Sequence, residues 1–80
     1  MPSPLAEPAT GALAVTPSDS ADLSVISRGL YVGVSGNVKV DMADGTTATF
    51  VSMAAGIVHP FRVRRVYSTL TTATSIMIVY

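Results

Sequence analysis

Hydrophobic and polar residues alternate along most of the chain after residue 21. In the segment 29–34, for example, Leu30, Val32 and Val34 occupy every second position. Alternation at this period is typical of strands that turn one face toward a core. The segment 22–27 is a strand-like lead-in, and the pattern then predicts strands at about 29–34, 37–42, 46–51, 57–66 and 74–80.

Turn residues separate these strands. Ser35-Gly36-Asn37 predicts a tight hairpin between the first two, because such residues tolerate the positive φ angles that short hairpins need. Ala43-Asp44-Gly45 predicts a second turn. The glycines at 29, 33 and 36 superficially resemble a phosphate-binding loop, but that motif requires a following helix, which this sequence does not predict. They therefore indicate hairpin geometry.

The fourth predicted strand, 57–66, departs from regular alternation at two places. Pro60 lies inside it, which indicates an edge position or a bulge, since proline cannot donate a hydrogen bond to a ladder. Arg65 then interrupts the alternation before Val66 restores an apolar side chain. This pattern predicts a β-bulge at Arg64–Arg65.

The last predicted strand, 74–80, is apolar on both faces. Met77 and Val79 are therefore predicted to contact another subunit; the alternative is that the strand is central in a tightly closed barrel. Short strands, tight turns and no helical periodicity together predict an all-β fold. We expect a small antiparallel β-sandwich or barrel of five to six short strands with an extended N-terminal arm.

Proline is concentrated in residues 1–21, which hold four of the five prolines in the chain. Because proline disfavours regular ladders, we divide the chain into a Pro-rich arm at 1–21, extended or disordered, and a β domain at 22–80. The arm is either a disordered tail or a segment that orders against a neighbouring subunit through Leu5, Leu13, Ala14 and Val15. A polyproline-type ligand is a weaker third alternative, because Pro4 and Pro8 are spaced by four residues.

Composition indicates an oligomer. Eighty residues make at most one domain, and the chain has no cysteine with which to form a disulfide. Only 12% of the residues are charged and 49% are hydrophobic, whereas ordinary soluble domains carry roughly 25% charged residues. A small domain of this kind exposes apolar surface unless other subunits cover it.

The sequence predicts no membrane partner and no secretory signal. The start of the chain has no basic side chain, and no apolar run approaches the ~20 residues of a transmembrane helix. The expected place of synthesis and folding is therefore the cytoplasm. The formal net charge of zero gives no general attraction to nucleic acid or anionic lipid.

No catalytic constellation is present in the sequence. His59 is the only histidine, and no nucleophile or orienting carboxylate accompanies it in a recognisable pattern, so we predict a structural or surface role for it. Asp41 and Asp44 are close in sequence, but one belongs to a strand that faces it outward and the other to a turn, which argues against a metal pair. We expect no enzyme activity, no cofactor and no metal.

Arg62, Arg64 and Arg65 form the one basic cluster. The favoured interpretation is that these guanidinium groups pair with carboxylates across a subunit boundary. Contact with a different partner that is not a nucleic acid is a second interpretation. Binding of a nucleic acid is a third, in which basic residues combine with stacking aromatics such as Tyr67.

Several motifs follow one another in a characteristic order. They are Ser27-Arg28-Gly29-Leu30-Tyr31-Val32-Gly33, Val38-Lys39-Val40, Asp44-Gly45, Val51-Ser52-Met53-Ala54-Ala55-Gly56, Pro60-Phe61-Arg62-Val63-Arg64-Arg65-Val66 and Thr69-Leu70-Thr71-Thr72-Ala73-Thr74. This ordered set, over roughly residues 22–80, resembles the head spike base proteins of tailed phages and phage-derived gene transfer agents. Two positions depart from the expected pattern: Gly29 replaces an alanine, and Leu70 replaces a glycine.

The resemblance implies a virion structural protein: a homo-oligomeric head-spike base or capsid decoration. It would dock on the major capsid protein at vertices of the head surface, after assembly in the host cytoplasm, and can carry a spike fibre. A pentamer fits a five-fold vertex, and a trimer is the alternative. The candidate subunit or capsid interface residues are Leu5, Leu13, Val15, Arg62, Arg64, Arg65, Met77 and Val79.

Two other classes of function remain at this point. The first is a small oligomeric nucleic-acid-binding β barrel that uses Arg62, Arg64 and Arg65. The second is a small enzyme or ligand carrier with a site between subunits, for which the sequence offers no reactive set of residues.

Overall fold

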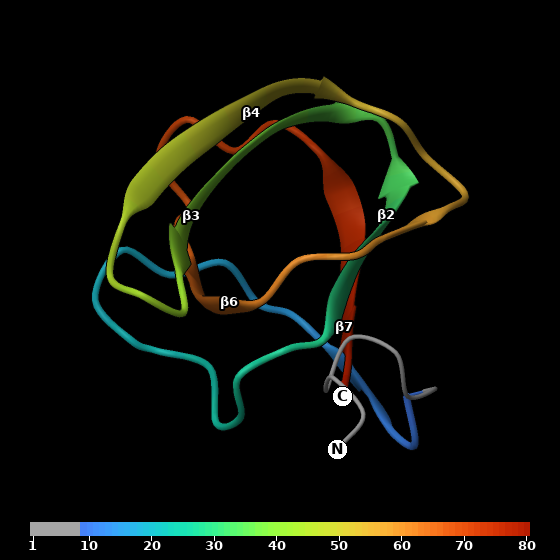
Figure 1. The fold of residues 1–80 in the computed structure, drawn as a ribbon. Coiled ribbons are helices and arrows are strands. Elements are labelled where there is room, and N and C mark those ends of the chain that lie inside the picture. The colour runs from blue at the N-terminus through green and yellow to red at the C-terminus, as the bar shows by residue number, and fades with distance from the viewer. Residues whose placement is uncertain (1–8) are drawn as a thin grey trace.

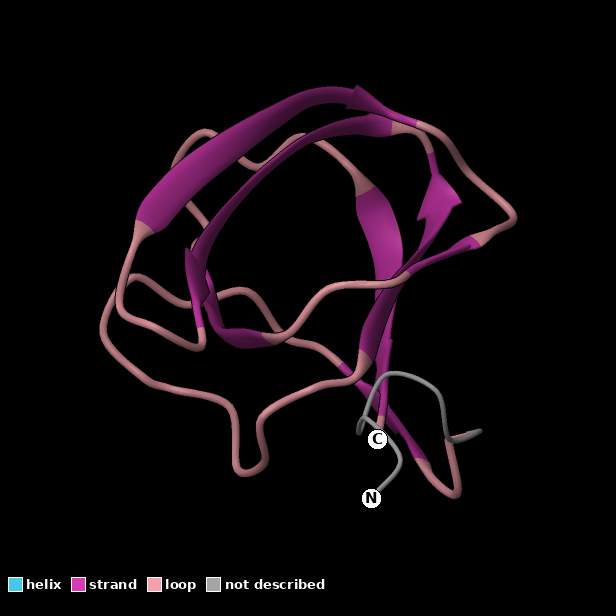
Figure 2. Cartoon of the chain, in the orientation of Figure 1, coloured by secondary structure: helices cyan, strands magenta, loops and turns pink. Residues whose placement is uncertain are grey.

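The computed structural model describes residues 9–80 and confirms an all-β fold, a sandwich of two antiparallel sheets (Figure 1). Sheet A has the strand order β1-β7-β2-β5, and sheet B has the order β4-β3-β6. In the described part of the chain the connections are loops and turns, without helices (Figure 2). The strands are β1 (Ala12–Ala14), β2 (Gly29–Val34), β3 (Gly36–Met42), β4 (Thr47–Met53), β5 (Val58–His59), β6 (Val63–Val66) and β7 (Thr74–Val79).

The core lies between the two sheets and is built from the alternating apolar positions that predicted the strands. Leu30 and Val32 of β2 and Ile78 of β7 enter it from sheet A, while Val38 and Val40 of β3 enter it from sheet B. All five side chains are fully buried, and along each strand an exposed or half-buried residue lies between the inner positions. The period-2 pattern therefore identified the inner face of each long strand correctly.

The predicted hairpin at Ser35-Gly36-Asn37 is wrong. β2 and β3 do not pair with each other; they belong to different sheets, and the chain bends between them (Figure 1). Gly36 does not adopt positive φ. A Cβ atom on Gly36 would instead lie 2.7 Å from the backbone nitrogen of Ala73. Glycine is needed here because two crossing backbone segments approach closely, not because a tight turn requires it.

The single strand predicted at 57–66 is divided in two. The chain leaves sheet A after β5 and enters sheet B at β6, and Pro60 lies in the crossing segment beside edge strand β5. Buried Ser27 holds this crossing: the backbone N–H of Val63 donates to its hydroxyl oxygen over 2.9 Å. The predicted bulge is confirmed, because the register between β3 and β6 skips Arg64.

The predicted turn at Ala43-Asp44-Gly45 is confirmed. Gly45 has a φ of 92°, its N–H donates to the Met42 carbonyl over 2.9 Å, and the Met42 N–H donates to the Thr46 carbonyl over 2.7 Å. The turn residues therefore predicted this hairpin correctly, and both of its strands belong to the same sheet.

The structure shows the local surroundings of both departures from the expected family pattern. Leu70 has a φ of 67°, in the region that glycine occupies without strain. At Gly29, a Cβ atom would lie 2.6 Å from the Val58 side chain, so alanine at this position requires Val58 to move.

The described part of the predicted arm lies on its own domain. Strand β1 pairs with β7 of the same chain, and the N–H group of Ser18 donates to the carbonyl of Val66 in β6. Just after the arm, the N–H group of Leu23 donates to the carbonyl of Arg64 in the same strand. The lead-in at 22–27 is not a regular strand. Leu5 lies outside the described residues, and the division of the chain at residue 21 stays a prediction.

Matched valine truncations test the position of the core. Val38→Ala removes two methyl groups from a fully buried side chain and is expected to lower the free energy of unfolding by about 2–3 kcal/mol. Val51 is 71% exposed, so Val51→Ala is expected to change it by less than about 0.5 kcal/mol. Urea unfolding at equal protein concentrations measures both, and equal losses would contradict this assignment of the core.

Candidate functional site

The outer face of sheet A presents a row of apolar side chains that crosses all four strands. Ala14 of β1 pairs with Met77 of β7, Met77 with Tyr31 of β2, and Tyr31 with Val58 of β5. Paired residues of antiparallel strands point to the same face, so these side chains are neighbours. Met77 is 37% exposed and Val58 is 50% exposed.

A second apolar group lies beside this row. Val79 and Val58 both lie within 3.1 Å of the position that a Cβ atom on Gly29 would occupy, so their side chains converge over the glycine. No sheet position on this outer face carries a charged side chain among the described residues. We call the group Ala14, Tyr31, Val58, Met77 and Val79 the apolar face. It brings together two of the predicted interface residues, Met77 and Val79.

The other apolar residues predicted for the interface lie elsewhere. Leu13 pairs with buried Ile78 and so belongs to the inner side of sheet A, where it is 38% exposed at the margin. Val15 packs against the core, and its N–H donates to the carbonyl of Ile76 over 2.9 Å. Both residues anchor the segment to its own domain in this structure.

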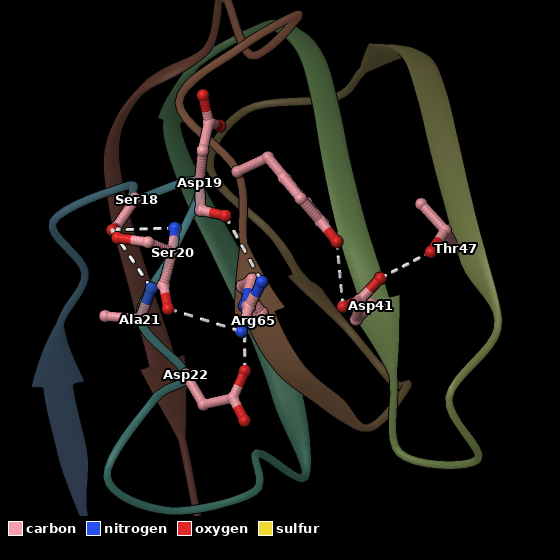
Figure 3. A network of polar contacts seen from close by, with 9 residues as sticks. Ser18, Asp19, Ser20, Ala21, Asp22, Asp41, Thr47 and Arg65 are labelled. Atoms are coloured by element: carbon pink, nitrogen blue, oxygen red, sulfur yellow. Dashed lines mark hydrogen bonds and ion pairs between the residues drawn. The ribbon is translucent and has the colours of Figure 1, made fainter.

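The three arginines do not form one basic patch. The guanidinium group of Arg65 donates to the Asp22 carboxylate over 2.8 Å and to the carbonyls of Asp19 and Ser20 (Figure 3). The hydrogen bond that Arg65 donates to Asp22 is the main cause that raises the pKa of Arg65. Arg62 and Arg64 are exposed. For Arg65, the partner carboxylate belongs to its own chain, which weakens the hypothesis of a nucleic-acid site made by all three.

A turn fixed by Asp19 completes the contact between segment 18–22 and the end of β6. The Asp19 carboxylate accepts hydrogen bonds from the backbone N–H groups of Ser68 and Thr69 and from the Thr69 hydroxyl. These bonds, led by the one from the Thr69 side chain, lower the pKa of Asp19. Sequence reasoning missed this site, because a Ser- and Asp-rich stretch indicates a turn without naming its partner.

The outer face of sheet B is polar, and Asp41 is its centre. Asp41 is only 5% exposed although its strand position faces outward, because Thr47 and Tyr67 cover it. Their hydroxyl groups donate to its two carboxylate oxygens, the Tyr67 bond over 2.9 Å (Figure 3 shows Asp41 and Thr47). The hydrogen bond from Thr47 is the largest cause that lowers the pKa of Asp41; burial opposes it. Lys39 lies 4.6 Å from the centre of the Tyr67 ring.

The structure places His59 in a structural contact. Its Nε2 atom lies 2.9 Å from the Ala54 carbonyl oxygen, and its ring is tilted against Phe61. Within residues 9–80 there is no group of three side chains suited to hold a metal and no pocket. In the same range there is no helix of the length and hydrophobicity that crossing a membrane requires.

Comparison with known proteins finds a structural relative. No protein-family model and no curated protein sequence matches this chain. A chain in the structure of the capsid of a native gene transfer agent (GTA) particle, computed with C5 symmetry, superposes with a TM-score of 0.84. The two chains are 34% identical, and the match covers 99% of this chain and 92% of that one.

A threonine substitution tests the Asp41 network. Thr47→Val removes the main hydrogen bond that lowers the pKa of Asp41, so this pKa is expected to rise toward its ordinary value. A lowered pKa stabilises the fold above the unfolded value of about 3.9, and this contribution is lost as the pH falls through the folded pKa. The difference in the free energy of unfolding between the native chain and the variant should therefore be largest near neutral pH and become smaller in acid.

An NMR titration of the Asp41 carboxyl group and urea unfolding as a function of pH measure these two effects. Thr49→Val is the matched control, because Thr49 is the next outward threonine on β4 and pairs with Lys39 rather than Asp41. An unchanged Asp41 titration in Thr47→Val would contradict the assigned cause.

Replacing Arg65 tests the attachment of segment 18–22. Arg65→Ala removes the ion pair with Asp22 and the bonds to two carbonyls, so the amides of Ser18 and Leu23 should exchange with deuterium roughly two- to fivefold faster. Arg64→Ala is the control, since Arg64 is the exposed bulge residue beside it. Equal effects of the two substitutions would show that charge alone, and not these bonds, holds the segment.

Proposed function

This chain belongs to the family of that gene transfer agent capsid-particle component, and on this premise we propose that it is a virion structural protein, a head-spike base or capsid decoration. The observation that carries the proposal is near-complete structural similarity, at 34% identity, to a chain of the capsid of a native GTA particle. The order of motifs along residues 22–80 supports the spike-base role in particular. In that role the protein docks on the major capsid protein and can carry a fibre.

A ring of five copies is the assembly that this proposal favours. The relative belongs to a particle computed with C5 symmetry, which is the symmetry of a capsid vertex. In a cyclic ring each subunit contacts its two neighbours through two different surfaces. A trimer is the alternative, and it would not match the symmetry of the vertex.

The apolar face of sheet A supports a role in assembly. A small domain that leaves Met77, Val58 and Tyr31 side by side on one sheet face gains stability when another protein covers them. With no charged sheet position on this face among the described residues, a covering protein would not have to desolvate a charge. The face is therefore proposed as a contact surface in the particle.

A charge placed on the apolar face tests the proposal. Met77→Lys is expected to reduce incorporation into particles by at least about tenfold, because a lysine ammonium would have to be buried without a partner. Thr74→Lys, an exposed position on the same strand, is the control. Copy number is measured in purified particles by quantitative mass spectrometry, and electron microscopy of the same particles gives position and symmetry. Absence of the native chain from particles would refute the proposed function.

A further inference from the structure

Each sheet ends in two edge strands, and two of these four edges are protected. Strand β5 has only two residues and is followed by Pro60, which has no N–H to donate. The outer edge of β6 is covered by its own chain, because the N–H groups of Ser18, Leu23 and Ser27 donate to its carbonyls. Soluble proteins commonly protect sheet edges in such ways. The edges of β4 and β1 remain.

Strand β4 is a long edge that is interrupted only near its end, where its register with β3 shifts opposite Gly36–Val38. Its seven residues, Thr47–Met53, contain no proline, no glycine and no charge. Along an antiparallel strand, the backbone groups of successive residues point alternately toward the paired strand and away from it. Because the Met42 N–H donates to the Thr46 carbonyl, the backbone groups of Thr46 point toward β3. It follows that the N–H and C=O groups of Thr47 and Thr49 point away from β3. No described residue pairs with this side of the strand.

Strand β1 has a second open edge: it is only three residues long, but backbone bonds of Gly11 with Tyr80 and of Val15 with Ile76 extend its pairing with β7 at both ends. Gly11 and Tyr80 exchange two backbone hydrogen bonds, so the backbone groups of Gly11 point toward β7. Every second residue then points the opposite way, and the N–H and C=O groups of Ala12 and Ala14 point away from β7. Residues 9–16 around this strand contain no proline and no charge. Within residues 9–80, no strand pairs with this edge.

We propose that β4 of one copy pairs with β1 of the next copy, so that sheet B of each subunit continues into sheet A of its neighbour. Main-chain hydrogen bonds would supply the contact, as in other cases of strand addition. This inference rests on the proposed ring and names the surfaces that close it.

A second copy of this chain is the partner that fits both edges. The two edges lie in different sheets and differ in sequence, so joining them makes a head-to-tail contact of the kind that closes rings. Pairing β4 with β4 would make a two-fold dimer, which cannot generate the C5 arrangement of the relative's particle. The small side chains of Ala12 and Ala14 leave room for an incoming strand.

Cysteine cross-linking tests the pairing directly, because the native chain has no cysteine. A panel of double variants combines Thr47→Cys, Thr49→Cys or Val51→Cys on β4 with Ala12→Cys or Ala14→Cys on β1. Oxidation, or a short dithiol cross-linker, should convert at least one double variant into a ladder of covalent multimers that ends at the full ring. The single-cysteine variants serve as controls and should give no ladder.

Thr49→Pro provides a second test. Proline at an outward-facing edge position leaves the ladder with β3 intact but removes the N–H offered to the neighbour. The ring should dissociate to monomers in light scattering, while circular dichroism shows retained strand content. Thr49→Val, which keeps the N–H group, should leave the ring intact.

The outcomes separate this inference from the proposed function. A native ring that gives no ladder with any cysteine pair and survives Thr49→Pro would overturn the β4–β1 contact and leave the particle role standing. Cross-linked dimers from Thr49→Cys alone would show β4–β4 pairing and would also overturn it. A native chain that is monomeric and absent from particles would refute the proposed function itself.

Discussion

The close contact between two crossing segments is the constraint on which the rest of the sandwich depends. The chain passes from sheet A to sheet B at Gly36 and returns through residues 71–73, and the two passages bind each other. The Asn37 carbonyl accepts the N–H of Thr72 over 2.8 Å, and the Thr72 hydroxyl accepts the N–H of Asn37 over 2.8 Å. Without a side chain at Gly36, the backbones can approach closely enough to make these bonds.

The segment before β2 stabilises the opposite side of the molecule by polar contacts. Arg65 and Asp19 hold residues 18–22 against β6 and the turn after it, and this contact covers the β6 edge of sheet B. Burial of Asp41 under Thr47 and Tyr67 adds a second polar cluster on the same sheet. On the outer face of sheet B, the Asp41 carboxylate therefore has its hydrogen-bond partners within the subunit, whereas sheet A presents the apolar face. This difference between the faces is what a subunit bound on one side requires.

The sequence predicted those features of the fold that depend on neighbouring residues. Alternation located the inner residues of the long strands, and Asp44-Gly45 located the turn between β3 and β4. Pairing between strands depends on distant residues, so the role of Gly36 opposite Ala73 could not be seen from its surroundings in the sequence. The apolar face was predicted at Met77 and Val79, but its partners Tyr31 and Val58 come from other strands. The Arg65–Asp22 pair joins residues from two segments and gave no local signal.

The unprotected edge of β4 also has a consequence for the chain before assembly. An uncharged seven-residue edge strand can add any extended segment that it meets, including strands from unrelated or partly folded proteins. Copies that have not yet assembled would therefore be prone to fibrous aggregation, more strongly the higher their concentration.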